Sequence, residues 1–237
     1  ELVCLACEGF TEGNEDLVRR SREADERGET LETGPDFTVS QALRSRAFWF
    51  ISLGHGFTSM VLLAFMLHLA PMMTDQNYSL QTASFIVSAY TAVSMVFQLI
   101  GGYVGDRIPK NVALMMFTMC QAAGVFYLTF GPPTLVTAYG FALLFGIGFG
   151  GRNPISSSIR GDYFGRQHYG KIMGISQVPM NVLLLIGPVF AGYMRDSTGT
   201  YTVAFAVLGA LAVVGGFCFL MATKPRSPDQ DRVKSIS

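Results

Sequence analysis

Residues 83–110, ASFIVSAYTAVSMVFQLIGGYVGDRIPK, contain the pattern that decides the fold. Residues 83–104 include no Asp, Glu, Lys or Arg, and Asp106, Arg107 and Lys110 follow shortly after them. A helix needs roughly 20 apolar residues to cross a hydrocarbon layer about 30 Å thick, because each residue adds about 1.5 Å. This stretch therefore predicts a membrane-spanning helix that ends in a charged loop.

Five further apolar stretches of comparable length occur along the chain. The six predicted spans cover residues 47–70, 83–104, 112–130, 134–150, 172–194 and 201–222. Pro71 is expected to end the first span, and a long polar loop is expected over residues 151–171. The composition agrees, since 14% of the residues are charged, compared with about 25% in soluble domains. The chain is therefore predicted to be an all-α membrane protein with six transmembrane helices.

Charged residues gather at the two ends of the chain and divide it into three parts. Residues 1–46 are expected to form an acidic and polar cytoplasmic linker, residues 47–222 the six-helix bundle, and residues 223–237 a disordered cytoplasmic tail. In the predicted topology every Lys and Arg except Arg195 lies on one side of the membrane. Because Lys and Arg resist translocation, both termini are predicted to be cytoplasmic.

Several other classes of protein are disfavoured by the sequence. A formal net charge of +0 argues against nucleic acid as a partner, since phosphate contacts need an excess of basic residues. Cys4 and Cys7 form a single pair without a second pair or a histidine nearby in the sequence, so no metal or cofactor is predicted. The sequence lacks the signatures of aquaporins, intramembrane serine proteases and potassium channels. The chain is therefore not expected to be an enzyme.

A glycine-rich stretch, residues 146–151, ends the fourth predicted span. Gly146, Gly148 and Gly151 match a dinucleotide-binding pattern, but that pattern opens a helix after a strand, and this one closes a membrane helix. We interpret these glycines as sites of close helix packing or helix bending.

Neutral polar side chains recur on one face of three predicted helices. In the second span, Ser88, Thr91 and Gln98 share a face because their spacing follows the helical repeat. The candidates for lining a solute cavity are Ser52, His55, Ser59, Ser88, Thr91, Gln98, Gln177 and Asn181, with Arg152 near the cytoplasmic end of the fourth span. The alternative is that these groups only form hydrogen bonds between helices, as is common in membrane bundles.

His55 is the one titratable candidate within the first span. Three roles are open to it: a hydrogen bond to a polar or anionic solute, uptake of a proton coupled to transport, or a structural bond to a neighbouring helix. The predicted spans hold no Asp, Glu, Lys or Arg at mid-membrane depth. This disfavours an ion pump or a proton relay built from carboxylates.

The loop after the second predicted span carries a motif. Gly102, Asp106, Arg107 and Lys110 match the pattern Gly-x-x-x-Asp-Arg-x-Gly-Arg/Lys, with Pro109 in place of the second glycine. This stretch resembles the cytoplasmic loop that follows the second helix of each half in the major facilitator superfamily. A second stretch, residues 152–174, resembles the loop between the fourth and fifth helices of a half, and it is most similar to the monocarboxylate and oxalate/formate branch.

The resemblance implies the C-terminal half of a twelve-helix transporter whose two halves rock about a central site. It makes residues 1–46 the central loop, and it implies three partners: an N-terminal six-helix half, a small-molecule solute and the lipid bilayer. The plasma membrane, in bacteria the inner membrane, is the expected location. A non-transporting membrane receptor or assembly module that keeps the half-fold is the alternative function.

The resemblance also assigns roles to charged residues at the cytoplasmic side. Asp106 and Arg107 are expected to form a latch that closes the inner gate. The residues assigned to this gate and its loops are Gly102, Asp106, Arg107, Lys110, Arg160, Asp162 and Arg166. An anchoring role for the same charges is the simpler alternative.

One departure from the family pattern bears on the solute. Oxalate-type members are expected to carry a basic residue in the second and fifth helices of this half, and neither predicted span has one here. Arg152 is the one basic residue near the predicted cavity, and its side chain is expected to extend to the membrane interface. A dicarboxylate is therefore disfavoured, and a monocarboxylate or a neutral organic solute is favoured.

Overall fold

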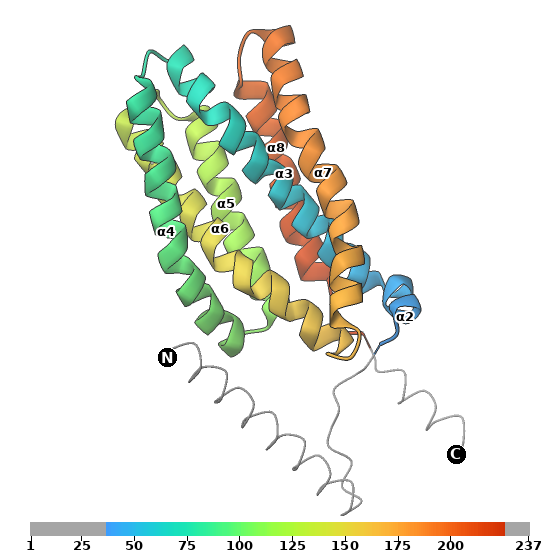
Figure 1. The fold of residues 1–237 in the computed structure, drawn as a ribbon. Coiled ribbons are helices and arrows are strands. Elements are labelled where there is room, and N and C mark those ends of the chain that lie inside the picture. The colour runs from blue at the N-terminus through green and yellow to red at the C-terminus, as the bar shows by residue number, and fades with distance from the viewer. Residues whose placement is uncertain (1–36, 226–237) are drawn as a thin grey trace, which may run out of the picture.

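The computed structural model describes residues 37–225, so most of the predicted linker and tail, with Cys4 and Cys7, lies outside the described residues. Within this range the chain is helical and has no strand: α2 (Val39–Arg44), α3 (Arg46–Asp75), α4 (Leu80–Arg107), α5 (Lys110–Phe130), α6 (Leu135–Phe164), α7 (Tyr169–Thr198) and α8 (Thr202–Met221). Figure 1 shows the long helices α3 to α8 running along one bundle, with the short α2 at its lower end. We call this end the α2 end and the opposite one the outer end.

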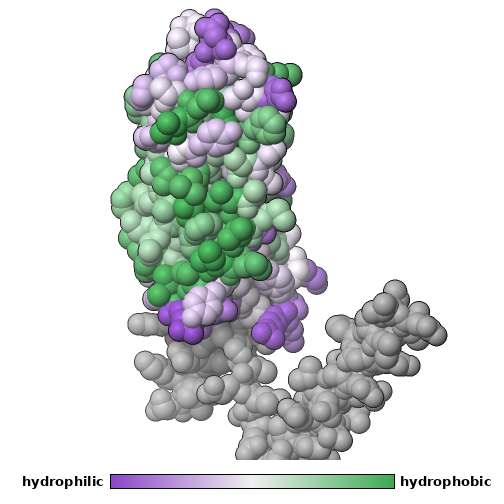
Figure 2. All heavy atoms as spheres, turned by 90° about the vertical axis from the view of Figure 1, so that its left-hand side faces the viewer, coloured by the Kyte–Doolittle hydropathy of each residue, from purple (hydrophilic) through white to green (hydrophobic). Residues whose placement is uncertain are grey.

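The six long helices confirm the predicted membrane class. Each of α3 to α8 is long and apolar enough to cross a membrane. Figure 2 shows a hydrophobic band around the middle of one face of the bundle, with hydrophilic residues at both ends. An even number of spans brings both ends of the described chain to the α2 end (Figure 1). There the Phe37 N–H donates to the Phe164 carbonyl over 3.0 Å, and the Tyr163 hydroxyl donates to the Ala222 carbonyl over 2.9 Å.

Two predicted helix ends are wrong. α3 continues through Pro71 to Asp75, and α6 continues through Pro154 to Phe164, so most of the predicted polar loop 151–171 is helix. A proline removes one backbone hydrogen bond, and neighbouring helices in a membrane bundle compensate for that loss. Arg152 therefore lies in the middle third of a helix instead of at its end.

The helices interleave instead of packing in chain order. α6 packs mainly against α4 and α5, whereas α3 packs mainly against α7 and α8. α5 also packs against α8 and so joins the two groups, while α3 and α6 make few backbone contacts with each other. Side chains from α3 and α6 therefore meet in the space between the two groups.

Glycines of α6 set the distance to its neighbours. A Cβ atom added at Gly148 would lie 2.4 Å from the Gln121 backbone nitrogen of α5, and one added at Gly150 would lie 2.3 Å from the Ser94 carbonyl oxygen of α4. Only residues without a Cβ allow backbones to approach so closely. This confirms the interpretation of the glycine-rich stretch as a packing device.

The residues just before the first span pack against the bundle. Thr38 and Gln41 form a capping box that starts α2, and Ala42 of α2 is buried. The Phe37 ring lies edge-on to the Phe164 ring, with centroids 5.8 Å apart. Residues 37–46, assigned by sequence to a solvated linker, therefore form part of the folded unit.

Candidate functional site

A polar cluster fills the space between α3 and α6. Its two largest members, Arg152 and Arg160 of α6, are each only 1% exposed. Arg152, Ser156 and Arg160 follow one another at four-residue spacing, which places them along one side of the helix. His55 and Thr58 of α3 meet them from the other side of the space. The cluster therefore links two helices whose backbones have little direct contact.

Arg152 is held by Thr58 of α3, which Gln121 of α5 contacts in turn. One terminal nitrogen of its guanidinium group donates to the Thr58 hydroxyl oxygen. The Thr58 hydroxyl lies 3.0 Å from the carbonyl oxygens of Gly54 and His55 in its own helix. The Gln121 amide of α5 donates to the Thr58 carbonyl over 3.3 Å. The arginine side chain is therefore fixed inside the bundle, and the expected extension toward the membrane interface does not occur.

His55 receives its hydrogen bonds from α6. Its Nδ1 atom lies 3.1 Å from a terminal nitrogen of Arg160 and 3.3 Å from the Ser156 hydroxyl oxygen. A guanidinium group can only donate, so Nδ1 is the acceptor and the proton of the neutral imidazole is on Nε2. The same Arg160 group also donates to the Ser156 carbonyl oxygen of its own helix. His55 is therefore oriented with its Nε2–H available as a donor.

Glycines on either side of His55 bring other helices close to the cluster. A Cβ atom at Gly54 would lie 2.9 Å from the Gly215 carbonyl oxygen of α8, and one at Gly56 would lie 2.6 Å from the Leu183 side chain of α7. His55 itself points toward α6. The Gly-His-Gly sequence thus lets α3 contact α6, α7 and α8 within one turn.

The cluster carries positive charge without a negative partner. Among residues 37–225, neither Arg152 nor Arg160 forms an ion pair with a carboxylate. The Nε atoms of both arginines are buried without a hydrogen-bond partner, as are the Gln121 amide oxygen and the Ser52 hydroxyl. Burial of a charged group costs several kcal/mol when it is not compensated. The arrangement is therefore suited to accept an anion.

The structure brings together only part of the predicted cavity lining. Within the predicted set, Ser52 and Ser59 are buried in α3, and His55 and Arg152 lie in the cluster. Ser88, Thr91, Gln98 and Asn181 are exposed on the outer faces of α4 and α7, and Gln177 is partly buried with its amide oxygen lacking a partner. The hydroxyls of Ser88 and Thr91 donate to carbonyls of their own helix over 3.0 and 2.8 Å.

Thr58, Gln121 and Ser156 belong to the cluster, but sequence reasoning did not single them out. Ser156 lies four residues from both Arg152 and Arg160. This spacing places the three residues on one side of a helix, but residues 151–171 were predicted to be a loop. Arg160, which was assigned to the gate, lies in the cluster instead.

The remaining charges of the gate motif lie at the α2 end. Lys110 at the start of α5 forms an ion pair with Asp162 near the end of α6. The Arg107 guanidinium lies 4.5 Å from the centroid of the Tyr103 ring. Asp106 and Arg166 are exposed. Among these residues the observed ion pair joins two neighbouring helices, α5 and α6.

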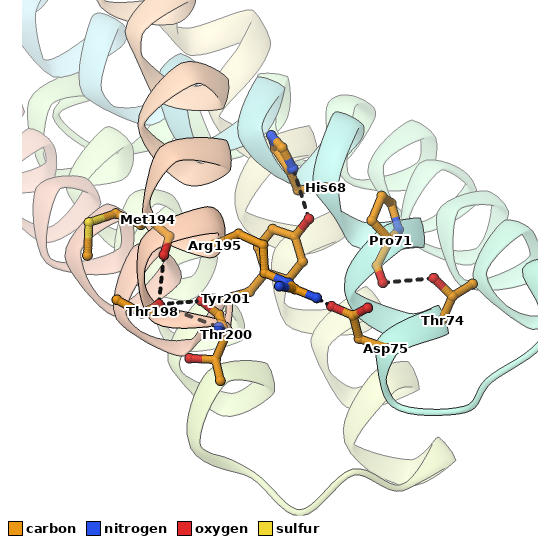
Figure 3. Close-up of polar contacts among 9 residues, drawn as sticks. All are labelled: His68, Pro71, Thr74, Asp75, Met194, Arg195, Thr198, Thr200 and Tyr201. Carbon is orange, nitrogen blue, oxygen red and sulfur yellow. Dashed lines mark hydrogen bonds and ion pairs between the residues drawn. The ribbon is translucent and has the colours of Figure 1, made fainter.

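A second polar network lies at the outer end (Figure 3). Arg195 donates to Asp75 over 2.9 Å, and its guanidinium lies 5.6 Å from the centroid of the Tyr201 ring. His68 Nε2 lies 3.0 Å from the Pro188 carbonyl oxygen, so Nε2 donates and the Tyr201 hydroxyl donates to Nδ1 over 3.3 Å. Burial raises the pKa of the Tyr201 phenol, which keeps this donor protonated.

This outer network borders a surface cavity of ≈ 360 Å³. The lining is completed by residues from the end of α3 and from the α7–α8 connection: Met72, Gln76, Gly199, Thr200 and Thr202. The network ties together the outer ends of α3, α7 and α8, the three helices of one packing group. Its role is therefore to fix these helix ends relative to one another.

The chain matches a known protein family and is similar to named transporters. Residues 47–236 match the family model described as "Major Facilitator Superfamily". The chain is 29% identical over 185 residues to "Monocarboxylate transporter 13" of Bos taurus, covering 70% of this chain and 41% of that protein. It is 28% identical over 152 residues to the protein of the same name from Rattus norvegicus, covering 62% of this chain and 35% of that protein. The chain thus spans about two fifths of the length of these relatives.

A solved structure has the same helical arrangement. It is described as "Crystal structure of auto inhibited POT family peptide transporter", and it matches with a TM-score of 0.67 at 18% identity. The match covers 78% of this chain and 39% of that structure. At this level of identity the likeness concerns the fold alone.

Proposed function

Because the chain belongs to the major facilitator superfamily, we propose that it forms one six-helix half of a secondary transporter. The transporter moves a small organic solute across the membrane by alternating access. The second half, which the resemblance places before residue 47, lies against the exposed faces of α4 and α7. The solute site is reached from one side of the membrane at a time.

The incomplete burial of α4 and α7 carries this proposal. Only 22% of the most apolar segment of α4 and 17% of that of α7 is buried, against 44% or more in each of the other four long helices. Hydrocarbon offers no hydrogen-bond partner to the polar groups that these faces expose. Gln98 and Asn181 therefore require a protein partner or a water-filled cavity beside them.

The exposed surface of α4 is divided lengthwise. Ser88, Thr91 and Gln98 occupy one side of the exposed arc together with Met95 and Leu99. The other side, with Phe85 and Val96, is apolar. A helix at the border between a cavity and the bilayer has this division, because one side contacts water or protein and the other contacts lipid. The polar side of α4 is therefore assigned to the cavity.

We propose monocarboxylates as the solute class. The relatives at 28–29% identity carry that name, and α4 and α7 lack a basic residue in their central parts. The α2 end is assigned to the cytoplasm, since every described Lys and Arg except Arg195 lies at that end or in the polar cluster. The plasma membrane, in bacteria the inner membrane, is the proposed location.

Uptake by the intact protein in proteoliposomes tests the proposal. An inward gradient of radiolabelled pyruvate should give uptake that saturates, and Gln98→Leu should reduce the rate because it removes a polar group from the cavity face. Val96→Leu on the apolar side of α4 is the matched control and should transport like the unaltered protein. Absence of uptake with pyruvate and with a neutral solute such as glycerol would favour the non-transporting alternative.

A further inference from the structure

We propose that Arg152, Arg160 and His55 form a buried subsite that binds the carboxylate group of the solute between α3 and α6. The inference deepens the proposed function and rests on it for the identity of the solute. It places the positive charge for solute binding on the fourth long helix of the bundle, opposite the first. The family resemblance leads one to expect it on the second and fifth helices instead.

The charge balance of the cluster is the first argument. Two guanidinium groups lie in the bundle interior, each 1% exposed, and no carboxylate among the described residues pairs with either. The chain pairs bases with acids at both ends of the bundle, as Lys110–Asp162 and Arg195–Asp75 show. Arg152 and Arg160 differ from the other described bases in being buried, and an anionic solute supplies the missing charge.

The unused donors are the second argument. Arg152 and Arg160 each retain a buried Nε–H without an acceptor. The bonds to Nδ1 leave His55 with its proton on Nε2, where no acceptor occupies it among the described contacts. A carboxylate accepts two parallel hydrogen bonds from a guanidinium group, and it accepts further donors at its remaining lone pairs. The cluster thus holds donors, at Arg152, Arg160 and His55, that have no acceptor among the described contacts.

The rigidity of the cluster is the third argument. Thr58 holds Arg152 and is itself held by Gln121, and Ser156 and His55 hold Arg160, before any solute is present. Donors that are already oriented lose little conformational entropy when the anion binds. A neutral solute would leave both charges uncompensated, so the subsite selects for an anion over a neutral molecule of similar size.

Binding to the purified intact protein tests the subsite. Thermal stabilisation is measured across titrations of pyruvate and, as a neutral probe, glycerol. Pyruvate should stabilise the unaltered protein and glycerol should not. Arg152→Gln and Arg160→Gln should each weaken the apparent affinity for pyruvate about 10- to 100-fold, because a hydrogen-bonded charge is lost. Arg44→Gln, at an exposed position of α2, should leave that affinity unchanged.

Two further measurements keep the test decisive. If either Gln variant fails to fold, Arg160→Lys takes its place, because it retains the charge without the paired donors. The Arg160→Lys protein should bind pyruvate more weakly than the unaltered protein does. It should still bind pyruvate more tightly than it binds glycerol. Equal pyruvate affinity in the folded Arg152 and Arg160 variants would overturn the subsite, whether or not the protein transports. Normal anion binding with no uptake into proteoliposomes would instead overturn the transporter proposal and leave the subsite standing.

Discussion

Replacement of Gly148 by alanine tests the close approach of α6 to α5. The new Cβ atom would lie 2.4 Å from the Gln121 backbone nitrogen, 2.5 Å from the Phe117 carbonyl oxygen and 2.7 Å from the Gln121 Cα. All three are backbone atoms of α5, so no side-chain rotation relieves the contact. Ordinary contact distances begin near 3.4 Å, so α5 and α6 must separate by about 1 Å at this level.

The energetic cost follows from two opposing terms. Overpacking of a filled core typically costs about 1–3 kcal/mol, and alanine is favoured over glycine inside a helix by about 0.5–1 kcal/mol. We expect a net loss between about 0 and 2.5 kcal/mol from these two terms. Gly174→Ala in α7 is the matched control, because a Cβ atom there meets nothing within 4 Å. That variant should keep the gain of about 0.5–1 kcal/mol without the cost.

Thermal unfolding of the purified protein in detergent measures both changes. The Gly148 variant should melt below the unaltered protein, and the Gly174 variant should melt at or above it. Both variants carry the same Gly→Ala change, so opposite shifts in melting temperature would come from the different packing at the two positions. A Gly148→Ala protein that melts at or above the unaltered protein would show that α5 and α6 do not approach as closely as the structure has them.

Three further outcomes are expected at the ends of the bundle. Asp106→Asn in the intact protein should lower the rate of pyruvate uptake without reducing the amount of protein in the membrane, and undiminished uptake would contradict the latch. A double-mutant cycle on Lys110 and Asp162 should give a coupling energy of about 0.2–1 kcal/mol that shrinks at high salt, since the pair is partly exposed. Tyr201→Phe should lower unfolding stability by about 0.5–1.5 kcal/mol, because His68 loses its hydroxyl donor. A Tyr201→Phe protein as stable as the original would show that this bond contributes nothing.

The six-helix fold was predictable because membrane helices obey a simple rule of length and apolarity. Two features misled the prediction: Pro71 was expected to end the first span, and the polar residues 151–171 were expected to form a loop. α3 instead continues through Pro71, and α6 continues through Pro154 to Phe164. A proline is a local signal, whereas the packing that compensates for its missing hydrogen bond comes from helices distant in the sequence. The ends of α3 and α6 were therefore beyond local reasoning.

Features of the candidate site that lie within a single helix were predictable, whereas contacts between helices were not. The spacing of Ser88, Thr91 and Gln98 showed a shared face, but it did not show that this face is exposed. The contact of His55 with Arg160 joins residues 105 positions apart, and no periodicity within one helix indicates such a contact. Arg160 was assigned to the gate because residues 151–171 were predicted to form a loop, whereas Arg160 lies within α6.

The interleaved packing has a consequence for biosynthesis. α3 is the first long helix of this unit to leave the ribosome, but its main packing partners, α7 and α8, are made last. α4, α5 and α6 can assemble as soon as α6 is complete, because α6 packs mainly against these two predecessors. α3 therefore lacks its main partners in the membrane until α7 and α8 have been made. A premature stop after α6 would therefore leave α3 without its main partners, and quality control should remove such a chain.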